Sequence, residues 1–470
     1  MALTFYNSLT RSQVPFDPIE PRKARLYTCG PTVYNFAHIG NFRAYVFEDL
    51  LRRTLRYCGH DVEQVMNLTD VDDKTIRDSG AAGVSLREFT APFKKAFFED
   101  LDTLNVERAE HYPAATDHIE DMIRLVQTLV EKGYAYVAED KSVYFSIERF
   151  PDYGKLARID LSRMRSGERV KNDEYAKESV ADFALWKAWD EQDGDVYWDS
   201  PWGPGRPGWH IECSAMSMRY LGKTFDIHTG GVDNMFPHHE DEIAQSEAAN
   251  GCRFVNYWLH CAHLIVDGKK MSKSLGNFYT LRDLVERGYG GREIRWVLMG
   301  AHYRQHLNFT FQGLEDARAA LQRIDDFVLR LREAADAEDA AVEEAETRCK
   351  QAQLEFRAGL EDDLNVSAAL AALFDLVRDG NKMLRENRLG GAGANAFLNV
   401  LRDLDQVCGC LEIDRKGAEV PADVVALAHE RQKARGNKDF AAADRIRDEL
   451  ADRGWVVEDT AAGPRIKRRD

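Results

Sequence analysis

RLYTCGPTVYNFAHIGNFRAYVFEDLLRRTLRYCGHDVEQVMN, at residues 25–67, is the part of this 470-residue chain that best indicates its fold. It opens with a short strand predicted at 25–29, and apolar residues then recur at helical spacing over 41–58. A second strand is predicted at 62–67. A strand, a loop, a helix and a strand in this order indicate a parallel doubly wound sheet of the α/β class, whose ligands bind at the carboxyl ends of the strands.

The rest of the chain shows an insertion, a return of the parallel pattern, a helical region and a small final segment. Long amphipathic helices are expected after residue 310. The other elements predicted are a helix at 117–132, a hairpin of 134–137 with 143–147, a polar stretch around 163–178, a strand at 224–228, a helix at 238–249, an apolar segment at 261–266, a helix at 439–452 and extended pieces at 455–458 and 465–467.

We therefore predict five parts along the chain. The expected boundaries are 1–112 for the first half of a nucleotide-binding domain, 113–200 for the insertion, 201–310 for its second half, 311–414 for a helical bundle and 420–470 for a small mixed α/β segment. Breaks in the helical region are expected at a solvated acidic stretch near 338–346, at the glycines of 390–393 and at 415–417.

The composition is typical of a cytoplasmic protein. The N-terminal MALTFYNSLTRSQVPF lacks a basic start followed by an apolar run, and no stretch approaches the roughly 20 apolar residues that a membrane span requires. Eight cysteines are too few for a disulfide scaffold in so long a chain, so free thiols or metal ligands are expected. A formal charge of -16 argues against indiscriminate coating of nucleic acid, but it allows a partner held by a local basic patch such as 465–469.

Two short motifs, more than two hundred residues apart, together indicate an ATP site, although each alone is more often an ordinary turn or loop. The first is His38-Ile39-Gly40-Asn41 at a predicted helix start, where free N–H groups face an anion and Gly40 lets the backbone approach it. The second is the basic loop Lys270-Met271-Ser272-Lys273-Ser274. We expect His38 to donate to a phosphate oxygen, and Lys270 and Lys273 to stabilise the charge that develops on the reacting phosphate.

Possible metal ligands form a second constellation. Cys29 follows the first strand, Cys213 ends the run GWHIEC, and His238 and Glu242 are four residues apart on one face of a predicted helix. His239 and Glu240 would then point elsewhere. Thiolates, an imidazole and a carboxylate suit zinc better than magnesium. Ordinary buried cysteines and a polar helix start are the alternative interpretation, and the rival ligands are His210, His228 and Cys261.

A glycine pair at a strand end is a weaker indication of the same nucleotide. The run Thr229-Gly230-Gly231-Val232-Asp233 follows the strand predicted at 224–228. Glycines there let a ring or a ribose approach the backbone, and an aspartate just beyond commonly holds ribose hydroxyls. Short glycine turns are frequent, so this run supports the other motifs and does not stand alone.

Taken together, these residues resemble the class I aminoacyl-tRNA synthetases, and among them the cysteinyl-tRNA synthetase family. The similar blocks stand in the family's order and cover the catalytic core, whereas the C-terminal helices and the final mixed segment fit its anticodon-binding region with looser motifs. The blocks are YTCGPTVY at 27–34, HIG at 38–40, NLTDVDDK at 67–74 and the runs at 205–213, 236–242 and 270–274.

The resemblance implies a Rossmann-type core and one zinc ion per chain on the floor of the amino-acid pocket, held by Cys29, Cys213, His238 and Glu242. A soft ion binds a thiolate far better than a serine hydroxyl, so an editing domain would be unnecessary. With four protein ligands, the substrate sulfur would enter as a fifth. The implied reaction joins cysteine to the α-phosphate of ATP, which Mg2+ accompanies, and then transfers the cysteinyl group to the terminal ribose of tRNA(Cys).

Roles for single residues also follow from the resemblance. One departure concerns Asn41, where the family commonly has histidine; an amide still donates a hydrogen bond to a phosphate or ribose oxygen but carries no titratable charge. Trp209 has an alternative role as core packing. The implied roles are stabilisation of the displaced phosphates by His38, Lys270 and Lys273, binding of ATP by Gly40, Asn41, Gly230, Gly231, Asp233 and Lys273, and lining of the amino-acid pocket by Thr69 and Trp209.

The resemblance further implies that residues 311–414 bind tRNA, that 420–470 contact the anticodon and that the enzyme is a monomer. Unstacked RNA bases commonly stack on aromatic rings and guanidinium groups. An ordinary packed mini-domain would contain such side chains as well. The candidates in the final segment are Arg435, Phe440, Asp444, Trp455 and Asp459.

Two other functions remain open at this stage. A cysteine ligase of the mycothiol pathway shares the core and the zinc site but joins cysteine to an amino sugar and lacks the tRNA-binding C-terminus, against which the segment 420–470 argues. A non-catalytic paralogue should have lost metal ligands or loop lysines, yet Cys29, Cys213, His238, Glu242 and Lys273 are all present.

Overall fold

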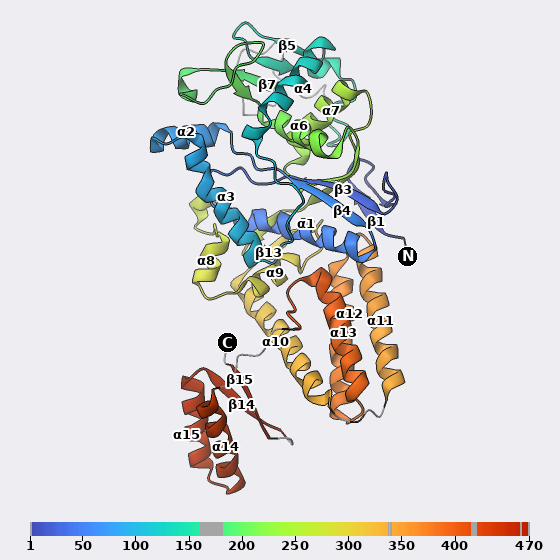
Figure 1. Ribbon diagram of the computed structural model, residues 1–470, viewed down its shortest axis with the longest axis vertical. Helices are drawn as coiled ribbons and strands as arrows, with labels where there is room; N and C mark the ends of the chain where they lie inside the picture. The colour runs from blue at the N-terminus through green and yellow to red at the C-terminus, as the bar shows by residue number, and fades with distance from the viewer. Residues whose placement is uncertain are drawn as a thin grey trace. The chain divides into compact units, whose positions relative to one another are not determined.

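The stretch at residues 25–67 folds as predicted in the computed structural model, which describes residues 2–159, 182–336, 338, 341–414, 421–460 and 463–468. Strand β3 (Lys23–Thr28) leads into helix α1 (Ile39–Tyr57), and strand β4 (Asp61–Met66) then pairs with β3 in parallel. The chain divides into two units, Met1–Ile413 and Asp414–Asp470 (Figure 1). No helix in the described part of the chain is long and apolar enough to cross a membrane.

Strands from the second half of the domain complete a four-stranded parallel sheet. Strand β9 (Phe225–Gly231) pairs with β3, and β10 (Val255–Cys261) pairs with β9, which gives the order β10-β9-β3-β4. From β3 the chain winds toward one edge and from β9 toward the other, so the switch point lies between β3 and β9. The predicted doubly wound sheet, split by an insertion, is therefore confirmed.

Two helices in the first half escape the sequence analysis, α2 (Asp73–Ala82) and α3 (Leu86–Thr103). Each starts with a capping box, in which Asp72 and Ser85 are the N-cap residues. Helix α3 also contains Pro92, a residue that argues against a helix when only the sequence is read. Packing of the apolar face of α3 against α1 outweighs this local preference.

The inserted region has an antiparallel sheet of its own. Helix α4 (Ile119–Glu131) precedes the sheet, and the predicted hairpin is confirmed as its first strand pair. The last strand lies past residue 200, the expected end of the insertion, yet it pairs with its neighbour within the insertion. The predicted polar stretch at 163–178 lies outside the described residues. The strands, in order of pairing, are β5 (Ala135–Val137), β6 (Val143–Phe145), β7 (Phe183–Ala188) and β8 (Gly205–Pro207).

Two elements predicted in the second half need correction. The apolar segment at 261–266 is not one element, because it holds the end of β10 and the separate strand β11 (Leu264–Val266). The helix at 238–249 is α7 (Glu240–Asn250) preceded by an irregular segment, η4 (Met235–His239), in which Phe236 has extended backbone angles. The other elements of this half are α6 (Trp209–Leu221), β12 (Lys269–Lys270), η5 (Lys273–Leu275), α8 (Leu281–Glu286), α9 (Gly291–Met299) and β13 (Leu307–Phe309).

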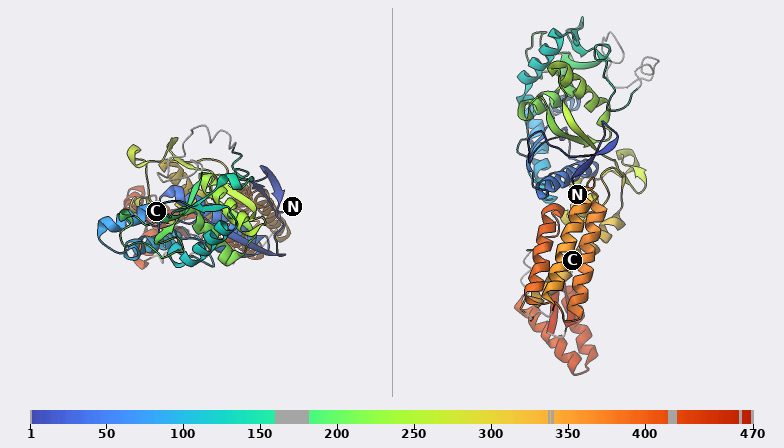
Figure 2. Two further views of the ribbon diagram at one scale, coloured as in Figure 1. Left: turned by 90° about the horizontal axis from the view of Figure 1, so that it is seen from above. Right: turned by 90° about the vertical axis from the view of Figure 1, so that its right-hand side faces the viewer.

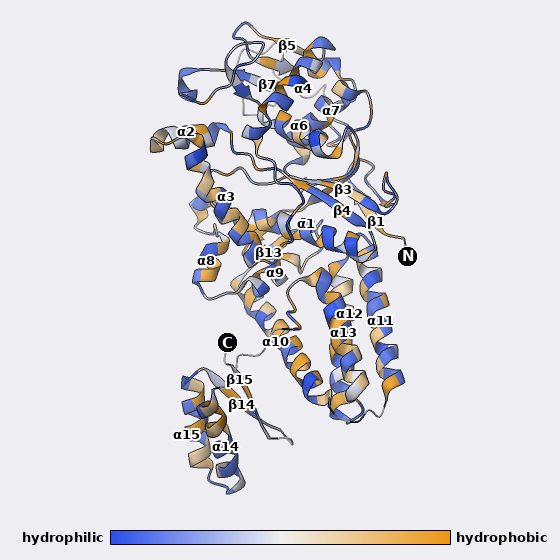
Figure 3. Cartoon of the chain, viewed as in Figure 1, coloured by the Kyte–Doolittle hydropathy of each residue, from blue (hydrophilic) through white to orange (hydrophobic). Residues whose placement is uncertain are grey.

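The predicted helical bundle follows, and its four helices run alongside one another (Figures 1 and 2). Hydrophilic and hydrophobic residues alternate along these helices (Figure 3), as the amphipathic pattern requires. The helices are α10 (Phe311–Ala334), α11 (Val342–Glu361), α12 (Val366–Arg385) and α13 (Gly391–Cys408).

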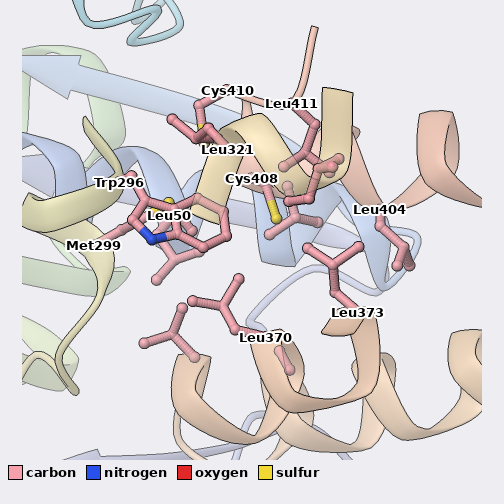
Figure 4. Close-up of a cluster of buried hydrophobic side chains, with 14 of the residues drawn as sticks. Leu50, Trp296, Met299, Leu321, Leu370, Leu373, Leu404, Cys408, Cys410 and Leu411 are labelled. Atoms are coloured by element: carbon pink, nitrogen blue, oxygen red, sulfur yellow. The ribbon is translucent and has the colours of Figure 1, made fainter. Parts of the chain in front are cut away.

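The bundle shares one hydrophobic core with the catalytic part of the chain. Leu321, Leu373 and Leu404 of the bundle belong to the same buried cluster as Leu50 of α1 and Trp296 of α9 (Figure 4). Burial of apolar surface at this junction stabilises the position of α1 relative to the bundle.

Two of the expected breaks fall at helix boundaries, between α10 and α11 and between α12 and α13, although each stretch runs into the helix that follows. The acidic stretch at 338–346 is helical from Val342 onward, since Glu343 and Glu344 lie in the first turn of α11, where carboxylates interact favourably with the helix dipole. At 390–393, Gly390 is the N-cap of α13 and the glycines after it form its first turn. The third expected break, at 415–417, lies outside the described residues.

The second unit contains two helices and a hairpin. Helix α14 (Ala422–Gly436) was not predicted, whereas α15 (Phe440–Asp452) was. Strands β14 (Trp455–Thr460) and β15 (Gly463–Arg468) pair in antiparallel and confirm the two extended pieces. The small core of this unit consists of Val424, Ala428, Leu450 and Val457.

Candidate active site and metal centre

The switch point of the sheet brings together site residues from both halves of the domain. Cys29 directly follows β3, and its N–H donates to the carbonyl of Thr229 in β9 over 3.3 Å. Gly230 and Gly231 end the same strand β9. Doubly wound sheets bind their ligands at this position, outside the carboxyl ends of the strands.

His38 and Asn41 form a reciprocal cap at the start of α1. Nδ1 of His38 accepts from the N–H of Asn41 over 3.2 Å, and Oδ1 of Asn41 accepts from the N–H of His38 over 3.1 Å. Because Nδ1 is an acceptor, the neutral imidazole carries its proton on Nε2, which is then available as a donor. Burial lowers the pKa of His38 and so favours this neutral form. The unusual Asn41 therefore has a structural use, since its amide oxygen completes the capping box.

The lysine loop contacts the same helix start. The backbone of His38 bridges to Thr280, just beyond the loop, and the N–H of Ile39 donates to the carbonyl of Tyr279 over 3.0 Å. At Gly40, an added Cβ would lie 3.1 Å from Cε of Met271. The structure thus places the two halves of the predicted ATP site in contact, although they come from distant parts of the chain.

The glycines at the end of β9 stand where a side chain would meet the site. A Cβ on Gly230 would lie 2.8 Å from Cε1 of His239, and one on Gly231 would lie 2.3 Å from Oδ1 of Asp233. The side chain of Asp233 is 69% exposed, and its Oδ1 lies 4.0 Å from Nδ1 of His263. Its carboxylate is therefore accessible to a ligand.

Cys29, Cys213, His238 and Glu242 converge, and one donor atom of each lies within 4.8 Å of the other three. Nε2 of His238 lies 3.2 Å from Oε1 of Glu242, close to the roughly 3.3 Å edge of a tetrahedron with metal bonds of about 2.0 Å. Oε1 of Glu242 is buried and makes no hydrogen bond in the described part of the chain. A buried carboxylate oxygen without such a partner is costly, so this donor set fits a zinc ion.

A second grouping shares two of these donors and combines Cys29 and Glu242 with His228 and His239. Nε2 of His239 lies 3.3 Å from Sγ of Cys29, so the expectation that His239 points away from the ligands is wrong. The backbone is irregular just before these residues, since Phe236 has extended angles (φ -144°, ψ 131°), and the consecutive histidines 238 and 239 are both buried. The other ring nitrogen of His239 also has a partner, since Nδ1 lies 2.9 Å from Nε2 of His260. The grouping with Cys213 and His238 contains two thiols, whereas the grouping with His228 and His239 contains one. Zinc is therefore expected at the grouping with two thiols.

The remaining rival ligands lie outside both groupings. Nδ1 of His210 is 2.9 Å from Nδ1 of His238, and its Nε2 is 3.3 Å from Oδ2 of Asp241, so it lies beside the cluster. Sγ of Cys261 lies 3.6 Å from the carbonyl oxygen of Ala262.

Without a cation the cluster favours neutral groups. The hydrogen bond with Cys213 and then burial raise the pKa of Cys29. The same bond lowers the pKa of Cys213, but burial and the nearby carboxylate of Glu242 raise it above its ordinary value. Burial lowers the pKa of His238 to about 3. A divalent cation reverses this balance for the thiols, because it favours the thiolate.

Trp209 and Thr69 lie beside the cluster. The ring of Trp209 stacks on His238 with centroids 4.3 Å apart and is 41% exposed, so it is not a core residue. The hydroxyl of buried Thr69 donates to Oε2 of Glu212 over 2.9 Å. The sequence analysis missed Glu212, because its partner Thr69 is 143 residues away, although the quoted run GWHIEC contains it.

The candidate RNA contacts of the second unit differ in exposure. Phe440 is 60% exposed, and Arg435 and Asp444 are exposed as well. Trp455 packs against the small core of that unit. The side chain of Asp459 lies outside the described residues.

Protein-family models match three regions of the chain. Residues 15–319 match the tRNA synthetases class I (C) catalytic domain, residues 355–412 match the DALR domain, and residues 418–464 match the cysteinyl-tRNA ligase anticodon binding domain. The first match alone covers more than half of the chain.

Solved structures of other synthetases share the fold. A Mycobacterium tuberculosis methionyl-tRNA synthetase in complex with methionyl-adenylate has a TM-score of 0.62 at 15% identity and covers 83% of this chain and 90% of its own. The leucyl synthetase of an Agrobacterium radiobacter K84 ternary complex has a TM-score of 0.60 at 12% identity, with coverage of 84% and 85%. At these identities the likeness concerns the fold alone.

Curated relatives match over the full length. The cysteine–tRNA ligase of Protochlamydia amoebophila (strain UWE25) is 50% identical over 99% of this chain and 98% of its own. That of Chlamydia muridarum (strain MoPn / Nigg) is 49% identical over 100% of both. With the catalytic-domain model that spans residues 15–319, this identity shows that the chain belongs to the cysteine–tRNA ligases, a family of class I aminoacyl-tRNA synthetases.

Proposed function

We propose that the protein attaches L-cysteine to tRNA(Cys) in two steps, as a cytoplasmic monomer. In the first, the cysteine carboxylate attacks the α-phosphate of Mg2+-bound ATP, which forms cysteinyl adenylate and releases pyrophosphate. In the second, a terminal ribose hydroxyl of the tRNA takes the cysteinyl group and AMP leaves. The observation that carries the proposal is the convergence of Cys29, Cys213, His238 and Glu242 beside the two phosphate motifs at the sheet switch point.

The phosphates of ATP would meet the start of α1. Among the described residues, Nε2–H of His38 makes no hydrogen bond and can donate to a phosphate, and the first turn of the helix adds N–H groups and a positive dipole end. Lys270 and Lys273 are exposed on the loop that contacts this helix start. As charge moves onto pyrophosphate, these cations would stabilise the transition state more than the ground state.

The adenosine would lie across the end of β9. Gly230 and Gly231 carry no side chain at the end of β9, so a ring or a ribose could approach the backbone there. The exposed carboxylate of Asp233 would accept hydrogen bonds from the ribose hydroxyls. The backbone at Gly40 and the amide of Asn41 complete the proposed ATP contacts.

The four metal ligands would form the floor of the amino-acid pocket and hold one zinc ion per chain. When bound there, zinc would supply a soft Lewis acid that prefers a thiolate to a hydroxyl, which would favour cysteine over serine. Trp209 stacks on the ligand His238 and is partly exposed, which suits a side chain that covers a small substrate. Thr69, which donates a hydrogen bond to Glu212, would line the same pocket.

The tRNA would contact the C-terminal parts. We assign the bundle at 311–414 to the body of the tRNA and the segment 420–470 to the anticodon, which the match of residues 418–464 to an anticodon binding domain supports. Exposed Arg435 and Phe440 offer a guanidinium and a ring for unstacked bases. Asp444, Trp455 and Asp459 complete the candidates.

The test is transfer of labelled cysteine to unfractionated tRNA in the presence of ATP and Mg2+. Charging of tRNA with cysteine and not with serine is the expected result. Exchange of pyrophosphate into ATP is measured in parallel, since it reports adenylate formation without tRNA. Pyrophosphate exchange without charging of tRNA would indicate a small acceptor such as an amino sugar. If zinc-replete, folded protein shows neither exchange nor charging, the proposed function is overturned.

A further inference from the structure

We propose that Asn277 and Phe278, the residues that follow the lysine loop, are positioning residues for it. Asn277 fixes the shape of residues 270–274, and Phe278 fixes where Lys273 lies relative to His38. The inference rests on the proposed function, because Lys273 and His38 are the groups expected to meet the phosphates of ATP.

One side-chain amide closes the loop. Oδ1 of Asn277 accepts from the N–H of Ser272 over 2.9 Å, and its Nδ2 donates to the carbonyl of Lys270 over 3.2 Å. The two bonds have opposite polarity and lie on either side of Met271, so only a side chain with both a donor and an acceptor can make them. Met271 is the residue that contacts the position of Gly40 in the helix start.

The short turn that carries Lys273 depends on the same anchor. Ser272 caps η5, because its Oγ accepts from the N–H of Leu275 over 3.3 Å. The N–H of Ser272 is the group that Asn277 holds, so the cap and the anchor share one residue. Loss of the Asn277 side-chain amide would let the backbone that carries Lys273 move more freely.

The ring of Phe278 contacts both phosphate-binding groups. Nζ of Lys273 lies 5.4 Å from the ring centroid, a cation–π distance, and the imidazole of His38 meets the ring at 5.1 Å and 78°. A cation–π contact at a partly exposed site is weak, so the ammonium group can leave the ring for a phosphate. The ring thus keeps Lys273 close to His38 before ATP binds and limits the rotamers that must be ordered afterwards.

Pyrophosphate exchange on the full-length, zinc-replete protein tests the inference. Asn277→Ala should lower kcat roughly tenfold, the effect expected when two hydrogen bonds that shape the loop are lost. Phe278→Leu should lower kcat several-fold, whereas Phe278→Tyr, which keeps the ring, should restore it. The matched control is Leu275→Ala, since that side chain is 58% exposed in the same loop. Its exchange rate should equal that of the parent.

Limited trypsin digestion gives a readout that needs no activity. Cleavage after Lys270 and Lys273, followed by mass spectrometry, should be faster in Asn277→Ala than in the parent and unchanged in Leu275→Ala. The inference is overturned if the parent protein exchanges pyrophosphate with cysteine while Asn277→Ala and Phe278→Leu match it in kcat and in cleavage. That result would leave the proposed function standing. Parent protein that exchanges nothing overturns the proposed function, and the cleavage rates still decide whether Asn277 holds the loop.

Discussion

Replacement of Asp49 by asparagine removes a buried carboxylate that pairs with two buried arginines, Arg53 and Arg295, between α1 and the helical bundle. Oδ2 of Asp49 accepts from Arg295 over 2.5 Å and from Arg53 over 2.7 Å, and its Oδ1 accepts from the N–H of Glu107 over 2.8 Å. The side chains of Asp49 and Arg295 are 0% and 1% exposed. Arg295 also donates to the carbonyl of Cys408 at the end of α13 over 2.6 Å, so the cluster joins the helix of the phosphate site to the bundle.

The expected loss follows from the burial of these charges. Removal of one partner from a buried ion pair typically costs about 3–5 kcal/mol, because a desolvated charge is left without compensation. Asparagine keeps the size of aspartate and an acceptor for Glu107, so we expect Asp49→Asn to lower the free energy of unfolding by about 3 kcal/mol. Asp375→Asn is the matched control, because the pair of Asp375 with Arg378 is 52% and 68% exposed and contributes little.

The pH dependence provides an independent check of the same reasoning. Burial by itself raises the pKa of Asp49, but the guanidinium groups of Arg295 and Arg53 outweigh it and hold the pKa below its ordinary value. A lowered folded-state pKa means that the stabilisation is complete above the unfolded value of about 3.9 and is lost as pH falls through the folded one.

Urea unfolding followed by circular dichroism measures both effects. The gap between parent and Asp49→Asn should stay constant from about pH 5 to about pH 8 and shrink in stronger acid. A variant within about 1 kcal/mol of the parent at neutral pH, or a gap that widens in acid, would refute the ion-pair reasoning.

Three further predictions concern the site and its surroundings. Burial raises the pKa of Glu48 to about 8, so the folded protein loses stability as the pH rises from the pKa of the unfolded state toward that of the folded state. Relative to Glu48→Gln, the parent should lose about 3 kcal/mol of unfolding free energy between about pH 5.5 and 8.5. A difference between the two proteins that does not change with pH in urea unfolding would contradict this. Lys273→Ala should sharply slow pyrophosphate exchange at unchanged zinc content, and joint loss of exchange and zinc would indicate misfolding instead. Cys213→Ala should bind much less zinc by metal analysis, while Cys58→Ala, a thiol outside the cluster, should keep it; equal zinc in both would exclude Cys213 as a ligand.

Local patterns identified most of the fold. The strand, helix and strand of residues 25–67 were predictable because a buried parallel strand and an amphipathic helix have different periods. Helix α3 was not, because Pro92 weakens its local signal and the packing against α1 that supports it is a long-range contact. The start of α11 was missed for a similar reason, since an acidic stretch resembles a solvated linker until the helix dipole is taken into account.

The candidate site divides in the same way. Residue type and spacing suggested Cys29, Cys213, His238 and Glu242 as ligands. They did not suggest that His239 also faces Cys29, because a regular helix was expected there, whereas the backbone is irregular at Phe236.

Residue types and their order are enough to indicate the chemistry: two thiols, an imidazole, a carboxylate and two phosphate motifs in a fixed order, together with the family to which that order belongs. The geometry is visible only in the folded chain. It includes the contact of Met271 with Gly40, the amide of Asn277 across the lysine loop and the carboxylate of Asp49 between two arginines. The physical reason is that hydrophobic periodicity and caps act over a few residues. Buried hydrogen bonds and ion pairs, in contrast, join residues hundreds of positions apart, and the packing of the whole unit chooses their partners.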